Sequence, residues 1–425
     1  MIGNLDDALE ALLAFPGRRD PHHVSLDVMA ETMELLGQPQ DKLRLIHVGG
    51  TSAKTSTAYL IRAGLEAAGF KTGLTVSPHV ATVNERVQIG GRPLEPAKFC
   101  AYVDALLARL KQMRRPVTYF ELVTSLALWV FACEKVDYAV VEVGLGGTRD
   151  ATNIARRPDK VSVIGPIGLD HTEKLGSTLA EIAAQKAGII VPGGAVFVAD
   201  QAPAALDVIT AHGRQLGAAV TVVPSPAAPD GSDVPDFQWR NWGLASAVLD
   251  YLGQRDGFAA TRPAGAELTG FLQANTPPGR YEWLTVGSRQ VLLDGAHNPQ
   301  KMAGLVETMR RRGVPALPTL ATLSSAPVDK VRQTLAELAP AVSRLIVPDF
   351  ALGRADKVKR SVPAEQVGAV ARQLGLDVTV VPNLAAAVET WLAGAEPELL
   401  VTGSLYLVAL VRPGLLALGR EAASG

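Results

Sequence analysis

The chain has 425 residues, more than one typical domain contains, so about two or three domains are expected. Hydrophobic residues make up 48% of the sequence and charged residues 20%, which is typical of a soluble globular protein. The formal net charge of −1 argues against a general electrostatic attraction to nucleic acid or to an anionic membrane.

The sequence lacks the features of secreted and membrane proteins. Its N-terminus has no basic region or signal-peptide cleavage pattern, and no run of about 20 apolar residues occurs. The two cysteines, Cys100 and Cys133, are too few for a disulfide framework and lie in apolar segments, so we expect both to be buried. A cytoplasmic monomer without nucleic-acid or membrane partners is the expected state.

The first 60 residues predict two helices followed by a strand, a glycine turn and a third helix. Apolar side chains recur at helical spacing within 5–13 and 28–36, and the apolar run 43–48 is typical of a buried parallel strand. The strand leads into the loop Gly50, Thr51, Ser52, Ala53, Lys54, Thr55 and Ser56. This is the layout of a phosphate-binding loop, in which helix N–H groups and a lysine hold phosphate oxygens.

The loop matches the phosphate-binding pattern G-x-x-x-x-G-K-S/T incompletely, because Val48 and Ala53 stand at its two glycine positions. The alternative interpretation is an ordinary strand-to-helix turn whose lysine faces solvent.

Strands and helices then alternate, which predicts a parallel sheet with helices on both faces. The predicted helices are 55–68, 96–113, 118–134, 177–188 and 241–252, and the predicted strands are 72–76, 138–143, 160–167, 195–199 and 219–223. Three of these strands lead into polar loops, at 77–79, 144–147 and 168–171. Ligands bind beyond the carboxyl ends of such strands, so these loops predict the site.

A second alternating series follows the break at 276–280. Its predicted strands are 290–294, 318–323, 343–348, 377–381 and 398–402, and its predicted helices are 300–312, 328–338, 364–374 and 384–394. We therefore expect an α/β protein with two domains. Residues 1–281 form a mostly parallel sheet of the phosphate-loop type, and residues 282–425 form a smaller doubly wound α/β domain.

Four polar residues at or near these strand ends are candidates for a magnesium site with nucleotide phosphates: Ser77, Glu142, His171 and Lys186. Oxygen ligands suit this hard cation. Each residue alone has a structural explanation. Glu142 could be an ion-paired structural residue, His171 a satisfied buried histidine and Lys186 a solvated lysine.

Nine short segments occur in one order over about residues 43–408. They are His47-Val48-Gly49-Gly50-Thr51 with Lys54; Ser77-Pro78-His79 with Glu85-Arg86; Thr118-Tyr119-Phe120-Glu121 with Thr124; Glu142-Val143-Gly144-Leu145-Gly146-Gly147 with Asp150-Ala151-Thr152-Asn153; Gly168-Leu169-Asp170-His171 with Leu175-Gly176; Lys186-Ala187-Gly188-Ile189; Pro278-Gly279-Arg280; Asp294-Gly295-Ala296-His297-Asn298-Pro299; and Gly403-Ser404-Leu405-Tyr406-Leu407. In this order they resemble the folylpolyglutamate synthase and dihydrofolate synthase family, within the Mur ligase superfamily.

The resemblance implies an ATP-binding domain with a folate site, a C-terminal glutamate-ligase domain, and a role for each matching residue. ATP would be held by residues 50–56, Asn241, Arg280, Asp294 and His297. Two magnesium ions would be ligated by Ser77, Glu142, His171 and Lys186, with Lys186 carried as a carbamate. Folate would contact Phe120, Glu121, Asp150 and Thr152, and the catalytic residues would be Lys186, His171 and His297.

The implied reaction is ATP-dependent addition of glutamate to a folate through an acyl phosphate, with dihydrofolate synthesis as a further activity. Two alternatives stay open: another amide ligase of the superfamily with a different carboxylate substrate, or a catalytically silent nucleotide-binding paralogue. The sequence departs from the family pattern at Ala53, Thr55, Thr148-Arg149, Gly165-Pro166 and Gln185. Ala53 is costly if its position requires a positive φ.

Overall fold

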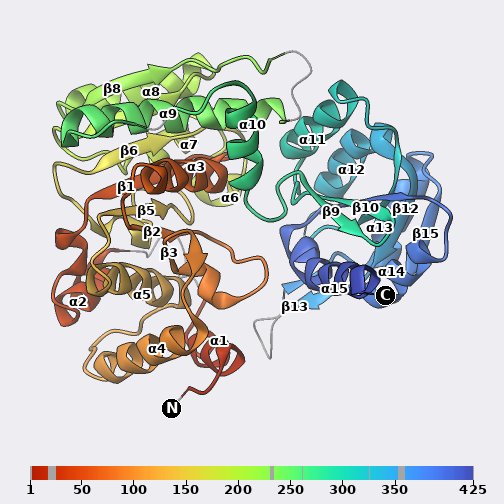
Figure 1. Ribbon diagram of the computed structural model, residues 1–425, viewed down its shortest axis with the longest axis horizontal. Coiled ribbons are helices and arrows are strands. Elements are labelled where there is room, and N and C mark those ends of the chain that lie inside the picture. The colour runs from red at the N-terminus through yellow and green to blue at the C-terminus, as the bar shows by residue number, and fades with distance from the viewer. Residues whose placement is uncertain are drawn as a thin grey trace. The chain divides into compact units, whose positions relative to one another are not determined.

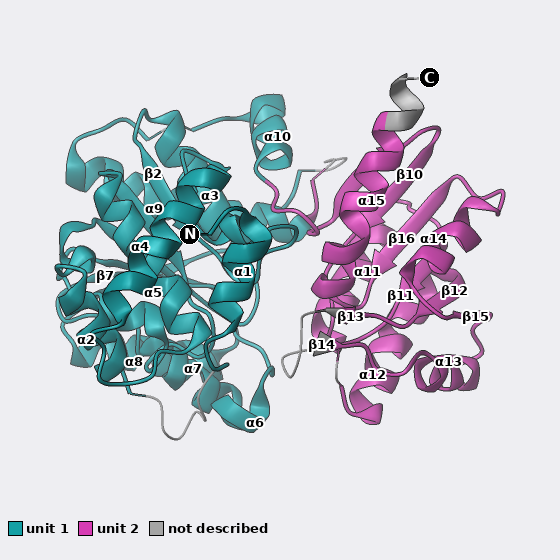
Figure 2. Cartoon of the chain, turned by 90° about the horizontal axis from the view of Figure 1, so that it is seen from below, with its two compact units in different colours: residues 1–229, 236–275 teal, residues 230–235, 276–425 magenta. Residues whose placement is uncertain are grey.

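A computed structural model of the chain describes residues 2–17, 25–229, 234–260, 262–324, 326–352 and 359–424. The chain divides into two compact units, one of residues 1–229 and 236–275 and the other of residues 230–235 and 276–425 (Figure 2). Each unit is an α/β structure built on a mostly parallel sheet, as the alternating elements predict. The assignment of an ATP-binding domain to 1–281 and a glutamate-ligase domain to 282–425 stays a prediction.

The first unit is built on an eight-stranded sheet with the order β4-β3-β2-β5-β1-β6-β7-β8. The strands are β1 (Leu45–Gly49), β2 (Thr72–Thr75), β3 (Gln88–Ile89), β4 (Arg92–Pro93), β5 (Tyr138–Glu142), β6 (Val161–Ile164), β7 (Ala195–Ala199) and β8 (Ala219–Val223). Neighbouring strands pair in parallel except at β3, which runs antiparallel to both β2 and β4. The four strands β2, β5, β1 and β6 are neighbours, so the loops that follow them meet at one edge of the sheet.

Helices cover both faces of this sheet (Figure 1). They are α1 (Leu5–Leu13), α2 (Asp27–Leu35), α3 (Lys54–Ala67), α4 (Pro96–Leu110), α5 (Tyr119–Cys133), α6 (Thr172–Leu175), α7 (Leu179–Ala187), α8 (Pro203–Gln215), α9 (Asp236–Asp256) and α10 (Gly265–Ala274). Helix α3 packs closely on α9, since a Cβ at Gly64 would lie 2.3 Å from Leu249 Cδ1. Helix α8 is not predicted by the sequence, because the buried positions that it offers, Ala205, Ile209 and Gly213, are mostly small.

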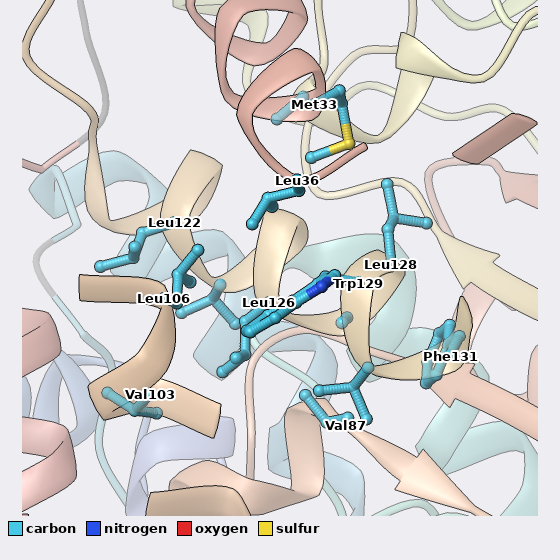
Figure 3. Packing of buried hydrophobic residues seen from close by; sticks show 14 of the residues in the cluster. Met33, Leu36, Val87, Val103, Leu106, Leu122, Leu126, Leu128, Trp129 and Phe131 are labelled. Atoms are coloured by element: carbon cyan, nitrogen blue, oxygen red, sulfur yellow. The ribbon is translucent and has the colours of Figure 1, made fainter. Parts of the chain in front are cut away.

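The largest core of the first unit surrounds α5, whose side chains are apolar on nearly every face (Figure 3). Leu122, Leu126 and Trp129 of α5 pack among residues of α2 and α4. Burial of each large apolar side chain stabilises the fold by roughly 1.5–3 kcal/mol. Cys100 is buried as expected, but the prediction for Cys133 is wrong, because Cys133 ends α5 and is exposed.

The second unit has a six-stranded sheet with the order β15-β12-β11-β16-β10-β9. Its strands are β9 (Glu282–Val286), β10 (Arg289–Leu293), β11 (Leu317–Ala321), β12 (Val342–Pro348), β15 (Val378–Val381) and β16 (Glu398–Thr402); β13 (Ala351–Leu352) and β14 (Lys359–Arg360) form a separate pair. The helices are α11 (Pro299–Arg311), α12 (Val328–Leu338), α13 (Ala364–Gln373), α14 (Leu384–Leu392) and α15 (Leu405–Ser424). Only β9 runs antiparallel within the six-stranded sheet.

Strand β9, helix α15 and the short strands β13 and β14 of the second unit are not predicted by the sequence. Strand β9 is a short hairpin partner of β10 and lacks a clear alternation. Helix α15 contains Pro413, which normally indicates a helix end, yet Val411 and Leu415 on either side are buried in the core. None of the helices in the described ranges is both long enough and apolar enough to span a bilayer.

Candidate active site

The loop between β1 and α3 requires glycine at Gly50. Its φ is 139°, and a Cβ there would lie 2.9 Å from Ser52 O and 3.2 Å from Gly165 Cα. The loop is fixed by Pro166 O, which accepts from Thr51 N at 2.9 Å and Ser52 N at 3.3 Å. The departure Gly165-Pro166 therefore has a local role: Gly165 leaves room for the loop and Pro166 holds it.

Ala53 is the N-cap residue of α3 and has φ 68° and ψ −16°, in the left-handed region. The position therefore requires a positive φ, and the departure from glycine is costly rather than mild. The first intrahelical hydrogen bond is Thr57 N to Ala53 O at 2.9 Å. The N–H groups before Thr57 have no intrahelical acceptor and carry partial positive charge, as a phosphate site needs.

Because the φ of Ala53 is strained, we expect a glycine substitution at this position to stabilise the protein rather than destabilise it. Ala53→Gly is expected to raise the free energy of unfolding by up to about 1 kcal/mol, because relief of the left-handed strain exceeds the added flexibility of the unfolded chain. Ala53→Val is expected to lower it, because β-branched residues fit this region worst. Urea unfolding of both variants measures this. A loss of stability in Ala53→Gly would contradict the left-handed assignment.

Glu142 ends β5 and connects three neighbouring strand ends. Its carboxylate accepts from Thr55 Oγ at 2.9 Å through Oε1 and from Ser77 N at 3.0 Å through Oε2. Only 4% of Glu142 is exposed. The loops after β1, β2 and β5 therefore meet at one buried carboxylate, and Thr55, a departure from the family pattern, is one of its donors.

Lys186 lies near the end of α7 and reaches the same loop. Only 4% of the residue is exposed, and Nζ donates to Gly50 O at 2.9 Å. Lys54 Nζ donates to the same carbonyl at 3.0 Å. Lys186 is thus not the solvated lysine of the alternative interpretation. The structure brings both lysines to the phosphate loop.

The loop that follows β5 forms hydrogen bonds with the carboxyl end of α7, and these bonds hold Lys186 in place. Thr148 donates to Gln185 O through both N (2.9 Å) and Oγ1 (3.1 Å). Asn153 Nδ2 donates to Thr148 O at 3.1 Å and to Gly188 O at 2.9 Å. The displaced motif Thr148-Arg149 therefore places Thr148 against the carboxyl end of α7.

Lys160 is a buried residue that the sequence patterns did not single out. Its Nζ donates to Asn153 Oδ1 at 3.3 Å, and it pairs with no carboxylate of the described residues. Burial, with a smaller effect of the nearby Arg156 cation, lowers the pKa of Lys160 to about 7. Lys160 therefore contacts the same Asn153 side chain that donates to Thr148 O and Gly188 O.

Asp150 and Thr152, which are predicted folate contacts, form hydrogen bonds within the loop that follows β5. Asp150 accepts from Leu145 N at 2.8 Å and from Thr152 Oγ1 at 2.5 Å. Since Thr152 gives its hydrogen to Asp150, its oxygen accepts from His47 Nε2, 2.8 Å away. Burial holds the pKa of His47 well below its ordinary value, so the imidazole is neutral. A folate contact of Asp150 or Thr152 stays a prediction.

The other predicted folate residues, Phe120 and Glu121, lie in the first turn of α5. Glu121 is buried and forms a capping box with Thr118, accepting from Thr118 N at 2.8 Å. Phe120 is half-buried and packs against the α5 core. Their local roles explain how α5 begins, and their contact with folate stays a prediction.

His171 and Asn241 stay predictions as well. His171 follows β6, has a side chain that is 52% exposed, and lies with Nδ1 3.8 Å from Glu173 Oε1. Asn241 is buried in α9, with Nδ2 3.3 Å from Gln238 Oε1. Across the ranges that the structure describes, no three His, Cys, Asp or Glu side chains gather as a metal site. A metal here would depend on the single carboxylate of Glu142.

In the second unit, Arg280, Asp294 and His297 meet at the carboxyl end of β10. Asp294 accepts from Tyr281 N at 2.9 Å and Ala296 N at 2.8 Å. Burial raises the pKa of Asp294 against the opposing effect of Arg280. A Cβ at Gly295 would lie 2.6 Å from Arg280 Nη1, so the guanidinium lies directly over this glycine.

Known proteins resemble this chain in sequence and fold over both units. Residues 279–405 match the family described as "Mur ligase, glutamate ligase domain". The dihydrofolate synthase/folylpolyglutamate synthase of Bacillus subtilis is 30% identical over 417 residues, which cover 91% of this chain and 94% of the relative. Two solved structures agree with the fold. Mycobacterium tuberculosis folylpolyglutamate synthase complexed with ADP has 29% identity and a TM-score of 0.79 over 96% of this chain and 97% of that chain. E. coli FolC in complex with DHPP and ADP has 25% identity and a TM-score of 0.80 over 98% of each chain.

Proposed function

Because this chain belongs to the dihydrofolate synthase/folylpolyglutamate synthase family, we propose that it is an ATP-dependent ligase that joins glutamate to a folate carboxylate. The observation that carries the proposal is the meeting of the phosphate loop, the Glu142 carboxylate and the Lys186 amine at neighbouring strand ends. We also propose that dihydropteroate is an acceptor, and that the protein acts as a cytoplasmic monomer.

ATP is proposed to bind with its phosphates on residues 50–56. The N–H groups that open α3 suit anions, and Lys54 adds positive charge beside Gly50. Asn241, Arg280, Asp294 and His297 are proposed as further nucleotide contacts. The relative from Mycobacterium tuberculosis is complexed with ADP, which supports a nucleotide in this fold.

The residues around Glu142 fit magnesium. Mg²⁺ commonly takes one or two carboxylates and completes its shell with phosphates and water. Glu142 supplies the carboxylate, which accepts from the Thr55 hydroxyl and from the backbone N of Ser77, and we propose the Ser77 hydroxyl as a further ligand. When bound, the ion would neutralise charge on the phosphate oxygens. His171 is proposed as a contact to a second ion.

A carbamate on Lys186 is consistent with its position. A carbamate keeps one N–H for the Gly50 carbonyl and adds two anionic oxygens. Only 4% of Lys186 is exposed, so a carbamate at this position would be sheltered from bulk water.

The proposed reaction has two steps. A carboxylate oxygen of the acceptor attacks the γ-phosphorus of ATP, ADP leaves, and an acyl phosphate forms. The glutamate amine then attacks the acyl carbon, loses a proton, and phosphate leaves with one oxygen of the original carboxylate. The chain's own part is to hold the phosphates on the loop and to neutralise part of their charge with Lys54.

An ATP-hydrolysis assay with a panel of acceptors tests the function. Glutamate is supplied with dihydropteroate, dihydrofolate, tetrahydrofolate or methylene-tetrahydrofolate, and amide product is measured together with phosphate. We expect product and phosphate in equal amounts with at least one acceptor. ATP binding without turnover of any of them would contradict the folate assignment and favour another carboxylate or a silent paralogue.

A further inference from the structure

Arg86 is a buried arginine in the segment between β2 and β3, and only 8% of the residue is exposed. Its Nε donates to His79 Nδ1 at 2.9 Å, and its Cζ lies 5.4 Å from the centroid of the Tyr119 ring. Within the ranges that the structure describes, Nη1 and Nη2 form no hydrogen bond and no carboxylate pairs with the guanidinium.

Neither of the two residues that contact Arg86 neutralises its charge. Burial, with a smaller effect of the Arg86 cation, lowers the pKa of His79 to about 3, so the imidazole is neutral. The Tyr119 ring attracts the guanidinium through its π-electrons but carries no net charge at neutral pH. A buried arginine normally has an anion as its partner, because removing its charge from water is unfavourable. The two Nη nitrogens of Arg86 therefore point to an anion that the protein itself does not supply.

The adjacent carboxylate, Glu85, is used by the backbone of the same segment. Its Oε2 accepts from Val80 N at 2.7 Å, and its Oε1 accepts from Ala81 N at 2.7 Å and from Thr82 N at 2.8 Å. These three hydrogen bonds fix the segment that carries Arg86 before any ligand binds.

The same segment begins in the candidate active site. The backbone N of Ser77 donates to the buried carboxylate that ends β5, at 3.0 Å. His79 follows two residues later, at most about 7 Å further along the chain. Tyr119 precedes Phe120, a predicted folate contact, in the first turn of α5. Arg86 is therefore joined to the carboxylate end of the site through His79 and to the start of α5 through Tyr119.

We propose that Arg86 binds a carboxylate of the acceptor substrate through Nη1 and Nη2. The planar guanidinium presents two parallel N–H donors, which match the two oxygens of a carboxylate. The inference rests on the proposed ligase function and adds a substrate contact to it. His79 is a positioning residue, because its Nδ1 lone pair orients the guanidinium. The carboxylate is either the one that reacts, which dihydropteroate also has, or the second one, which only a glutamylated folate such as tetrahydrofolate carries.

The first test uses the unaltered protein. Calorimetry in the presence of a non-hydrolysable ATP analogue compares dihydropteroate and tetrahydrofolate with analogues in which one carboxylate is replaced by a primary amide. We expect the amide at the recognised carboxylate to bind about tenfold to a hundredfold more weakly, the usual effect of losing a charged hydrogen bond. A loss with the dihydropteroate amide identifies the reacting carboxylate, and a loss only at the second carboxylate of tetrahydrofolate identifies that group. Equal affinity of every amide and its parent acid would overturn the inference.

The second test assigns this recognition to Arg86. Arg86→Gln should weaken binding of the acid by the same factor and leave the affinities for the amide and for the ATP analogue unchanged. The control Arg92→Gln removes the same charge from an exposed position of β4 and should bind every ligand as the unaltered protein does. An unchanged affinity for the acid in Arg86→Gln, or a loss that affects the ATP analogue or glutamate instead, would contradict the assignment. Thermal unfolding shows whether each variant folds, and Arg86→Lys, which lacks the planar pair of donors, is judged by the same criteria if Arg86→Gln does not fold.

Product assays separate this inference from the proposed function. If the unaltered protein forms amide product while Arg86→Gln changes no acceptor affinity, the inference is wrong and the function stands. If the unaltered protein binds an acceptor but forms no product, the function fails, and the acceptor affinities still decide the role of Arg86. If it binds neither acceptor, both are wrong.

A double-mutant cycle tests the positioning role of His79. We expect Arg86→Gln to weaken acceptor binding at least several-fold less in a His79→Ala background than in the unaltered protein, because the guanidinium has already lost its orientation. Equal effects in both backgrounds would show that His79 does not act through Arg86. A merely structural His79 would lower the melting temperature without this coupling.

Discussion

Replacement of Lys186 by alanine is expected to lower kcat by about two to three orders of magnitude, which is the usual effect of removing one preorganised electrostatic group from a reaction centre. Lys186 is buried and donates to Gly50 O, so it acts directly on the loop proposed to carry the phosphates. The fold should survive, because the carboxyl end of α7 is held independently by Thr148 and Asn153. Product formation at saturating ATP measures the effect.

Two further variants separate the possible roles of Lys186. Added bicarbonate should not restore Lys186→Ala, because no amine remains to be carbamylated. Lys186→Arg keeps the positive charge but forms no comparable carbamate, so it should be as inactive as alanine if the carbamate is required. Lys174→Ala, at an exposed lysine of α6, should retain full activity. An unaffected rate in Lys186→Ala would remove Lys186 from the site.

Lys160→Met is expected to stabilise the protein at pH 7 and to change how stability depends on pH. The pKa of Lys160 is lowered from 10.5 to about 7 in the folded protein, which corresponds to about 5 kcal/mol of unfavourable burial. Methionine fills a similar volume without a charge. It leaves Asn153 Oδ1 without this donor, which offsets part of the gain.

The sign of the pH dependence follows from the number of protons that each state binds. Between pH 7 and pH 10.5 the unfolded chain keeps the Lys160 proton and the folded chain has released it, so folded stability rises with pH. Below pH 7 both states are protonated and the group adds no slope. Between pH 7 and pH 9 the titration of Lys160 raises the free energy of unfolding by about 2–3 kcal/mol.

Urea unfolding of the unaltered protein, Lys160→Met and the surface control Lys111→Met across this pH range measures the effect. The free energy of unfolding of Lys160→Met should exceed that of the unaltered protein by less as pH rises. Lys111→Met should differ little from the unaltered protein at every pH. An advantage that is constant between pH 7 and pH 9 would show that Lys160 is not the titrating group.

The sequence predicted the parts of the site that depend on strand order. Parallel strands that end in polar loops place those loops at one edge, so Lys54, Ser77, Glu142 and Lys186 could be grouped before the fold was known. The structure confirms that these loops meet, through Thr55 and Ser77 on the Glu142 carboxylate. The burial of Lys186 also removes the interpretation of a solvated lysine.

The rest depends on side-chain directions and long-range pairs that local patterns do not contain. Lys160 precedes a strand, a position where a lysine is usually exposed. Only the tertiary fold shows that its Nζ donates to Asn153 Oδ1. In the sequence Gly165 is only a departure from the family motif, and the structure shows that it lies close to Gly50. The left-handed backbone of Ala53 is likewise visible only in the folded structure.

The most direct test of the ligase assignment follows one oxygen atom. A folate acceptor labelled with ¹⁸O in its reacting carboxylate is incubated with ATP, glutamate and the protein, and the released phosphate is analysed by mass spectrometry. The proposed reaction predicts that amide product forms and that each phosphate carries one ¹⁸O from the carboxylate. Amide product accompanied by unlabelled phosphate would contradict an acyl-phosphate route, and the absence of product from any folate would contradict the function itself.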